Sequence, residues 1–408
     1  MPTPKAQERP NPLGAKRVFW ILAYLGFILF LLELALRLQQ QLGPLSDLEF
    51  EHIKTGQESQ TLNHVNVPGK LIVPDSEHGI QELKGETLIY EYDENSIRIN
   101  RLQPDYPPSV IPFKVVFIGD SFTEGYMSEH TIPQHAWEYF QESGLKDIPM
   151  KFINAGVMSY SPLIYIPYVK KIIPLLKPDF VVMLIDETDM GDDYIYYRDL
   201  TDRDENGHVV AVRASPHHYE YVQGFVRAKK IPFYLVRWLM KMYYRHIKLP
   251  YLRRVFIRDK GAKDIFVYSK DTDIHAREKY AKEISFFKDN LGELVTTLID
   301  LMGNPSKILF VHNSHLEHLK PDESGHLWNS FVSDAVGEVT ARFGVFFYNP
   351  KDDLNQAFGE RPEDFYFKHD MHFNYEGLRI YGNFVAGKLY PLVSPLTRPL
   401  DPQVSERS

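Results

Sequence analysis

Short apolar runs alternate with helix-length amphipathic stretches from Phe113 onward. Five runs have the near-continuous apolar character of strands covered on both faces, at 114–119, 150–155, 179–185, 307–312 and 344–348. Helix-length stretches connect them near 131–143, 161–176, 275–302 and 326–342. This alternation predicts an α/β domain, with a central parallel sheet of five strands between two layers of helices.

The alternation is interrupted between residues 194 and 272. Asn206-Gly207 stands just before a Val-Val-Ala-Val run, a pattern typical of a β-hairpin. Residues 226–263 are rich in basic and aromatic side chains. They could form a basic face that contacts anionic lipid or polysaccharide. A pair of helices with solvated basic side chains is the favoured alternative, since the aromatic residues suit packing onto the sheet.

A long apolar segment lies near the N-terminus. Residues 18–32 carry no charge, and the apolar character continues to Leu38, which gives about the twenty residues of a membrane-spanning helix. Lys16 and Arg17 precede it, so the positive-inside rule leaves the N-terminus in the cytoplasm. No small-x-small cleavage site follows. A retained signal anchor is therefore favoured over a cleaved signal peptide, and a buried core helix is the least favoured. Glu33 would lie near the far interface, within reach of water.

These patterns predict a single-pass (type II) membrane protein with its main domain in the periplasm or outside the cell. The expected organisation is a cytoplasmic tail (1–17), a signal anchor (18–38), a linker with a small β-rich lead-in (39–112), the main α/β domain (113–392, with the insertion at 194–272) and a C-terminal tail (393–408).

Composition narrows the chemistry. The chain has 408 residues and a formal net charge of −8, which gives no reason to expect a nucleic acid as partner. It has no cysteine, which excludes disulfides, thiolate metal sites and a cysteine nucleophile. Aromatic residues make up 13%, which suits strands and a carbohydrate-facing surface equally well.

The first predicted strand ends in Gly119-Asp120-Ser121. Open α/β sheets place their chemistry at the carboxyl ends of the strands, so Ser121 is a candidate nucleophile. The alternative is a turn in which Ser121 caps a helix. Because a serine hydroxyl is a weak nucleophile, it requires a base nearby.

The candidate base is near the other end of the chain. His372 would act as general base, and Asp370 would orient its ring and stabilise the imidazolium. In an extended segment, residues two apart project to the same side, so both can face Ser121. The alternative is a surface turn in which Asn374 caps a final helix, and the two roles are compatible.

Together these segments resemble the SGNH (GDSL) hydrolase family, whose first block is Gly-Asp-Ser and whose last block carries an Asp and a His. The resemblance covers about residues 113–390. It implies a three-layer α/β/α fold and acyl transfer through an acyl-Ser121 intermediate. The Asp370-x-His372 spacing is similar to that of the branch of periplasmic polysaccharide O-acetyl esterases and O-acetyltransferases.

The resemblance also implies an oxyanion hole. Its donors would be the backbone N–H groups of Ser121 and Gly156 and the side chain of Thr188, which occupies the position of the family's usual asparagine. Further candidate cleft residues are Asp120, Asn154, Asp189 and Asn313.

No metal or cofactor is expected. The acidic residues between 186 and 193 have ligands that suit Ca²⁺ or Mg²⁺, but their spacing matches no EF-hand loop. His312, His315 and His318 are better explained as part of a loop at a strand end that lines the cleft than as a zinc site.

The expected function is that of a serine esterase that removes acyl groups, with an O-acylated envelope polysaccharide as substrate. An O-acyltransferase could use the same triad. A different class of protein is a catalytically impaired subunit that binds glycans or partners a membrane acyltransferase, and the loss of the usual asparagine at position 188 favours it.

The topology leads to the first prediction. An alkaline phosphatase fused to the C-terminus should be active in a bacterial host. The phosphatase becomes active only after export, and the signal anchor should place residues 39–408 across the membrane from the N-terminus. A well-expressed but inactive fusion would contradict this orientation.

Overall fold

The computed structural model describes residues 12–42, 69–74, 87–93, 95, 97–100, 102–125, 128, 130–213, 231–248, 250–252, 254, 265–321, 325–368 and 370–397. The chain divides into two compact units. The smaller comprises Met1–Ile53 and Glu220–Pro250, and the larger comprises Lys54–Tyr219 and Tyr251–Ser408.

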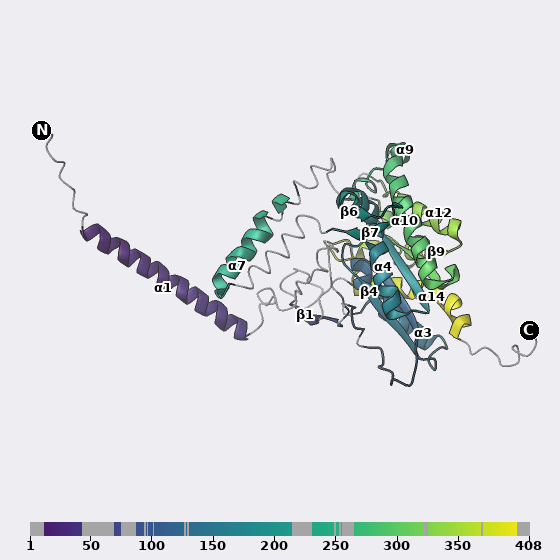
Figure 1. Cartoon of the computed structure of the whole chain (residues 1–408), viewed down its shortest axis with the longest axis horizontal. Coiled ribbons are helices and arrows are strands. Elements are labelled where there is room, and N and C mark those ends of the chain that lie inside the picture. Colours follow the sequence, from purple (N-terminus) through teal and green to yellow (C-terminus); the bar gives the residue numbers. More distant parts are fainter. Residues whose placement is uncertain are drawn as a thin grey trace, which may run out of the picture. The chain divides into compact units, whose positions relative to one another are not determined.

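A five-stranded parallel sheet is the centre of the larger unit (Figure 1). Its strand order is β4-β3-β5-β8-β9, so the strand that leads to Ser121 has a neighbour on each side. The strands are β3 (Phe113–Gly119), β4 (Met150–Gly156), β5 (Phe180–Asp186), β8 (Ile308–Asn313) and β9 (Phe346–Tyr348). The α/β fold class expected from the sequence is confirmed, and each strand lies within two residues of its predicted bounds.

Helices cover both faces of the sheet. Alternate residues of β3 belong to different cores: Val116 and Ile118 pack on one side, and Val115 and Phe117 on the other. The first core is completed by α4 (Pro162–Leu176), α10 (Ala281–Met302) and α12 (Phe331–Phe343). The second is completed by α3 (Ile132–Glu142) and α14 (Tyr375–Thr397). Because both faces are covered, the strands need no polar alternation, which explains their apolar sequences.

The connections contain shorter elements. The expected hairpin is present as β6 (Thr201–Arg203) and β7 (Val209–Val212), and the lead-in contains an antiparallel pair, β1 (Gly69–Pro74) and β2 (Thr87–Tyr92). The remaining elements of the larger unit are α2 (Ser121–Glu124), α5 (Asp189–Gly191), η4 (Asp192–Tyr197), η5 (Arg198–Leu200), η7 (Ile265–Val267), α9 (Ala276–Lys279), η8 (Pro305–Lys307), α11 (Leu316–Leu319), α13 (Lys351–Phe358) and η9 (Pro362–Phe365).

The smaller unit contains α1 (Pro12–Leu42), α7 (Tyr234–Tyr243) and η6 (Tyr244–Lys248). Within the described part of the chain, only Arg17–Leu38 of α1 is long and apolar enough to cross a membrane. Its length and composition are compatible with a signal anchor or a single-pass membrane helix. Within the basic and aromatic stretch at 226–263, residues 226–230, 249, 253 and 255–263 lie outside the described residues.

Glu33, the one acidic residue of the apolar segment, has partners within this unit. Its carboxylate accepts hydrogen bonds from the backbone N–H groups of Tyr234 (2.9 Å) and Leu235 (2.7 Å), in the first turn of α7. Arg37 donates to the same carboxylate at 2.8 Å and to the carbonyl of Pro232 at 2.8 Å. The first amides of a helix have no acceptor within the helix, and Glu33 supplies the acceptor for two of those of α7. The sequence led us to expect this carboxylate only near water.

The end of β4 packs directly against the helix that begins at Ser121. A Cβ on Gly156 would lie 2.3 Å from the backbone nitrogen of Glu124. Gly156→Ala should therefore lower the free energy of unfolding by about 1–3 kcal/mol, measured by thermal or urea unfolding of the purified chain.

Gly292→Ala provides the matched control. Gly292 lies inside α10, and an added Cβ would meet only one ring atom of Phe343, at 4.0 Å. This variant should be neutral or more stable by about 0.5–1 kcal/mol, since alanine favours helix interiors. Equal stability of the two variants would contradict the close packing of β4 on α2.

Candidate active site

Ser121 lies at a sharp turn between β3 and α2. Asp120 is the N-cap of α2, and its Oδ1 accepts from the backbone N–H of Phe122 at 3.0 Å. Ser121 is therefore the first helical residue and not the cap that the alternative interpretation required. Gly119 is necessary because a Cβ there would lie 2.1 Å from Oγ1 of Thr123.

The three residues predicted to act together are in contact. The Oγ of Ser121 is 2.6 Å from Nε2 of His372, although the residues are 251 positions apart. On the other side of the ring, Nδ1 of His372 forms a short hydrogen bond with Oδ1 of Asp370. When Nδ1–H donates to the carboxylate, Nε2 is left with a lone pair to accept the serine proton.

Backbone hydrogen bonds hold the loop that carries His372. The N–H of Phe367 donates to the carbonyl of His372 at 3.0 Å, and the N–H of Asn374 donates to the carbonyl of Phe365 at 3.0 Å. The ring of Phe122 packs on the imidazole with centroids 4.5 Å apart. Oδ1 of Asn374 accepts from the N–H of Gly377 at 3.0 Å, so Asn374 caps α14 as expected. The backbone hydrogen bonds of the loop and the ring of Phe122 thus both restrict the position of the His372 imidazole.

The charge on Asp370 suits its position. Burial alone would raise the pKa of this carboxyl, but the hydrogen bonds and the charge of His372 lower it below its ordinary value. Asp370 is therefore ionised at neutral pH. In that state it can stabilise an imidazolium formed on His372.

The expected oxyanion donors differ in their availability. Ser121 is the first residue of α2, so its N–H has no intrahelical acceptor and can serve a ligand. The N–H of Gly156 instead donates to Oδ1 of Asn154 at 3.0 Å. The hydroxyl of Thr188 donates to Oδ1 of Asp186. A hydroxyl has one proton, so Thr188 has none left for an oxyanion in this arrangement.

The four candidate cleft residues are buried, and each forms hydrogen bonds to neighbouring groups. Asn154 donates from Nδ2 to the carbonyl of Glu124 at 3.3 Å, which ties β4 to the end of α2. Asp189 accepts from the N–H of Asp186 at 3.2 Å through Oδ2. Oδ1 of Asn313 accepts from the hydroxyl of Tyr381. Asp120, the fourth, is the cap of α2.

Two buried pairs of acid and histidine lie at the ends of β5 and β8. Nε2 of His315 is 2.6 Å from Oδ2 of Asp186, and Nε2 of His312 is 2.9 Å from Oε2 of Glu187. His318 lies 3.4 Å from the same Glu187 carboxylate. Burial alone would raise the pKa of Glu187. The neighbouring histidines lower this pKa by more than burial raises it, so the carboxylate is ionised.

These pairs give hydrogen-bond or ion-pair partners to buried acidic and histidine residues at the ends of β5 and β8. Some of the residues that the sequence offered as possible metal ligands form ion pairs and hydrogen bonds with one another: Asp186, Glu187, His312, His315 and His318. The histidines lie in β8 and at the start of α11, and the acids lie at the end of the neighbouring strand β5. The two groups meet because Asp186 pairs in register with Asn313. No spacing within either segment could have revealed this pairing.

Arg98 of the lead-in is a second feature that the sequence did not reveal. It is buried, and its backbone N–H donates to the carbonyl of Asn154 at 3.1 Å, beside the edge strand β4. Its guanidinium donates to the carbonyls of Gly125 (2.8 Å) and Ser128 (2.5 Å). Arg98 therefore holds the chain just after α2, and the lead-in contributes contacts next to Ser121.

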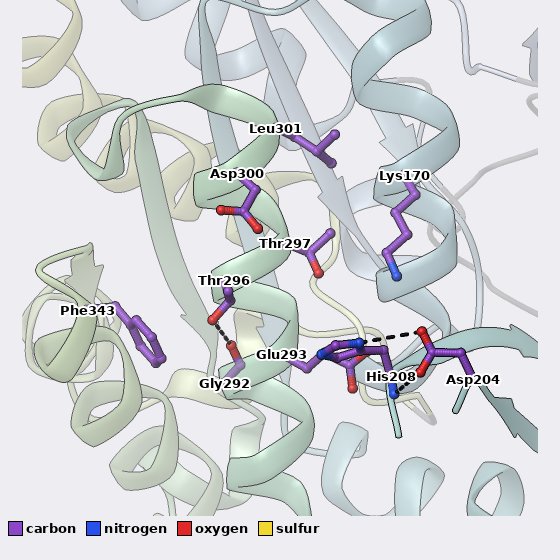
Figure 2. Close-up of a pocket in the computed structure, with 10 residues that line it drawn as sticks. All are labelled: Lys170, Asp204, His208, Gly292, Glu293, Thr296, Thr297, Asp300, Leu301 and Phe343. Carbon is purple, nitrogen blue, oxygen red and sulfur yellow. Dashed lines mark hydrogen bonds and ion pairs between the residues drawn. The ribbon is translucent and has the colours of Figure 1, made fainter. Parts of the chain in front are cut away.

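A separate hollow lies between α4, α10 and the β6-β7 hairpin (Figure 2). Figure 2 shows the side chain of His208 facing that of Asp204 in the lining of this hollow. Nδ1 of His208 and Oδ2 of Asp204 are 3.5 Å apart. The lining residues are Lys170, Asp204, His208, Gly292, Glu293, Thr296, Thr297, Asp300, Leu301 and Phe343. Ser121, Asp370 and His372 do not line this hollow, so it is separate from the hydrogen-bonded path that those residues form.

Comparisons with known proteins gave structural matches only. No protein-family model and no curated protein matches the sequence. The fold is similar to that of an acetylxylan esterase of Geobacillus stearothermophilus, with 12% identity over 69% of this chain and 93% of that one and a TM-score of 0.37. It is also similar to a lipase/acylhydrolase of Enterococcus faecalis (13% identity, 71% and 98% covered, TM-score 0.38). A putative GDSL-like lipase of Parabacteroides merdae matches with 11% identity over 69% and 100%, at a TM-score of 0.37.

These neighbours are hydrolases. The one from Parabacteroides merdae is described as GDSL-like, which is the type that the sequence motifs resemble. Identities and TM-scores this low carry no argument about activity, which depends on the geometry of the chain's own residues.

The engagement of Thr188 with Asp186 leads to a prediction. Thr188→Val removes the hydroxyl donor from a buried carboxylate and should lower the free energy of unfolding by about 1–3 kcal/mol. Thr188→Ser keeps the donor and should match the wild type. Esterase activity of the folded Thr188→Val protein should fall less than about 10-fold, because loss of a true oxyanion donor costs about 10²–10³-fold. A loss of activity in the larger range without a loss of stability would place the hydroxyl on the oxyanion instead.

Proposed function

We propose that the chain is an SGNH-type serine esterase that forms an acyl intermediate on Ser121. The observation that carries this proposal is the continuous hydrogen-bonded path from Ser121 Oγ through the imidazole of His372 to the ionised Asp370. Such a path activates a serine hydroxyl in unrelated folds.

Acylation follows from this geometry. Oγ of Ser121 attacks the ester carbonyl carbon as its proton passes to Nε2 of His372, and Asp370 stabilises the imidazolium. The backbone N–H of Ser121 donates to the oxyanion. When the tetrahedral intermediate collapses, the bond to the alcohol oxygen breaks and His372 returns its proton to that alcohol.

Deacylation repeats these steps with a different nucleophile. Water loses a proton to His372 and attacks the acyl carbon. When the second tetrahedral intermediate collapses, the bond between the acyl carbon and Oγ of Ser121 breaks, the acid leaves, and His372 returns its proton to Oγ. A sugar hydroxyl in place of water would make the same site an O-acyltransferase. The proposed substrate is an O-acyl group of an envelope polysaccharide, supported by the motif resemblance and by an N-terminal helix that would hold the domain beside the membrane.

An impaired binding subunit is the second candidate. It is favoured by the hydrogen bonds that occupy Gly156 N–H and the Thr188 hydroxyl, two of the three expected oxyanion donors. The intact contact between Ser121 and His372 argues against it, because a binding subunit gains nothing from that contact.

Hydrolysis of p-nitrophenyl acetate by the purified full chain in detergent tests the proposal. Ser121→Ala should lower kcat by about 10⁴-fold or more, and Asp370→Asn by about 10⁴-fold. Ser306→Ala, at an exposed serine outside the site, is the matched control and should keep full activity.

Two outcomes would contradict the esterase. Wild-type activity in Ser121→Ala would remove the serine as nucleophile. A wild type that is inactive towards every short acyl ester would favour the binding subunit. Acetylation of an added oligosaccharide, detected by mass, would identify transfer rather than hydrolysis.

A further inference from the structure

Three potential metal ligands meet on the N-terminal part of α3. His135 and Glu138 lie one turn apart on α3, and His130 belongs to the segment between α2 and α3. One ligand atom from each lies within 4.8 Å of the others. None of the three takes part in the hydrogen-bonded path of Ser121, Asp370 and His372.

The distances between these groups suit a single bound ion. Nδ1 of His135 is 3.1 Å from Oε2 of Glu138, and Nδ1 of His130 is 3.8 Å from Oε1 of the same carboxylate. An ion with bonds of about 2.0–2.2 Å holds tetrahedral ligands about 3.4 Å apart. These two separations lie on either side of that value, and the three ligand atoms lie within 4.8 Å of one another, so side-chain rotations can bring all three to one ion.

The two histidines also have unused ring nitrogens. Nδ1 of His130 and Nε2 of His135 are both buried and have no hydrogen-bond partner within the described residues. At 3.8 Å, Nδ1 of His130 is too far from Glu138 for a hydrogen bond. A buried ring nitrogen without a partner is costly, and an ion would satisfy the one on His130.

Neighbouring groups fix the ligands in place. Gln134 donates from Nε2 to Oε1 of Glu138 at 3.0 Å. Tyr375 packs edge-on against the rings of both histidines, with centroid distances of 5.2 and 5.8 Å. His135 is almost fully buried, whereas the side chains of His130 and Glu138 are about one-third exposed, at 33% and 37%. An ion can therefore enter from solvent and keep a water as its remaining ligand.

We propose that His130, His135 and Glu138 form a binding site for a first-row transition-metal ion such as Zn²⁺. Two imidazoles and one carboxylate suit Zn²⁺ better than Ca²⁺ or Mg²⁺, which prefer oxygen ligands. The ion fastens the segment after α2 to α3. Tyr375, three residues after His372, packs on both ligand rings, so the site lies beside the loop that carries the base. This proposal does not depend on the esterase activity.

Titration of the metal-free full chain, purified without a histidine tag, tests the site. One equivalent of Zn²⁺ should bind by calorimetry, and Co²⁺ should give the visible absorption of a low-coordinate site. Glu138→Gln and His130→Ala should each weaken Zn²⁺ binding at least about 100-fold, because even outer-shell partners are worth about 10–100-fold. Zn²⁺ should also raise the Tm of the wild type but not of these variants.

The chain supplies a matched control in His275 and Glu278. They have the same spacing, with Nδ1 3.6 Å from Oε2, but both are mostly exposed, and they form no group of three ligands in the described chain. Glu278→Gln should leave Zn²⁺ affinity unchanged. The proposal is overturned if the wild type binds no Zn²⁺ at micromolar concentrations. It is also overturned if Glu138→Gln and His130→Ala, with wild-type Tm in the absence of metal, bind as tightly as Glu278→Gln.

Discussion

The site depends on one hydrogen bond, between Oγ of Ser121 and Nε2 of His372. It joins residues 251 positions apart, so no local structure can form it. The parallel sheet brings Ser121 to the end of an inner strand, and the packing of α14 on the same face as α3 places the His372 loop above it. A fold that positions two segments to hydrogen-bond distance must be rigid on both sides, and both are held by backbone hydrogen bonds and by the ring of Phe122.

This arrangement buries several carboxylates, which costs free energy. Asp186 and Glu187 lie at the end of β5, with almost no exposure, where isolated carboxylates would be strongly destabilising. His315 and His312 on the neighbouring segment compensate them at 2.6 and 2.9 Å. Asp120 and Asp189 lack such partners, and burial together with the charge of Asp186 raises the pKa of each. The two ion pairs and the raised pKa values of Asp120 and Asp189 thus limit the net negative charge of these buried acidic residues.

The sheet and the contact of Ser121 and Asp370 with His372 could be predicted, because each leaves a recognisable pattern within short segments of the sequence. Strands covered on both faces need apolar residues throughout, and Gly119-Asp120-Ser121 and Asp370-x-His372 each carry their chemistry within three residues. The hydrogen bonds that engage two of the three expected oxyanion donors could not be predicted. Asn154 takes the amide of Gly156, and Asp186 takes the hydroxyl of Thr188, in both cases through a side chain two residues away. Such local competition depends on side-chain direction, which the sequence does not fix. The pairs of acid and histidine depend on strand register and were equally hidden.

Labelling with an alkyl fluorophosphonate tests most directly whether Ser121 is an activated nucleophile. The reagent reacts with a serine whose proton is removed by a neighbouring base, so peptide mass mapping of the labelled full chain should find the adduct on Ser121. His372→Ala should abolish the adduct, since it removes the group at 2.6 Å from Oγ. An unlabelled wild type, or an adduct that forms on Ser121 equally well without His372, would contradict the account.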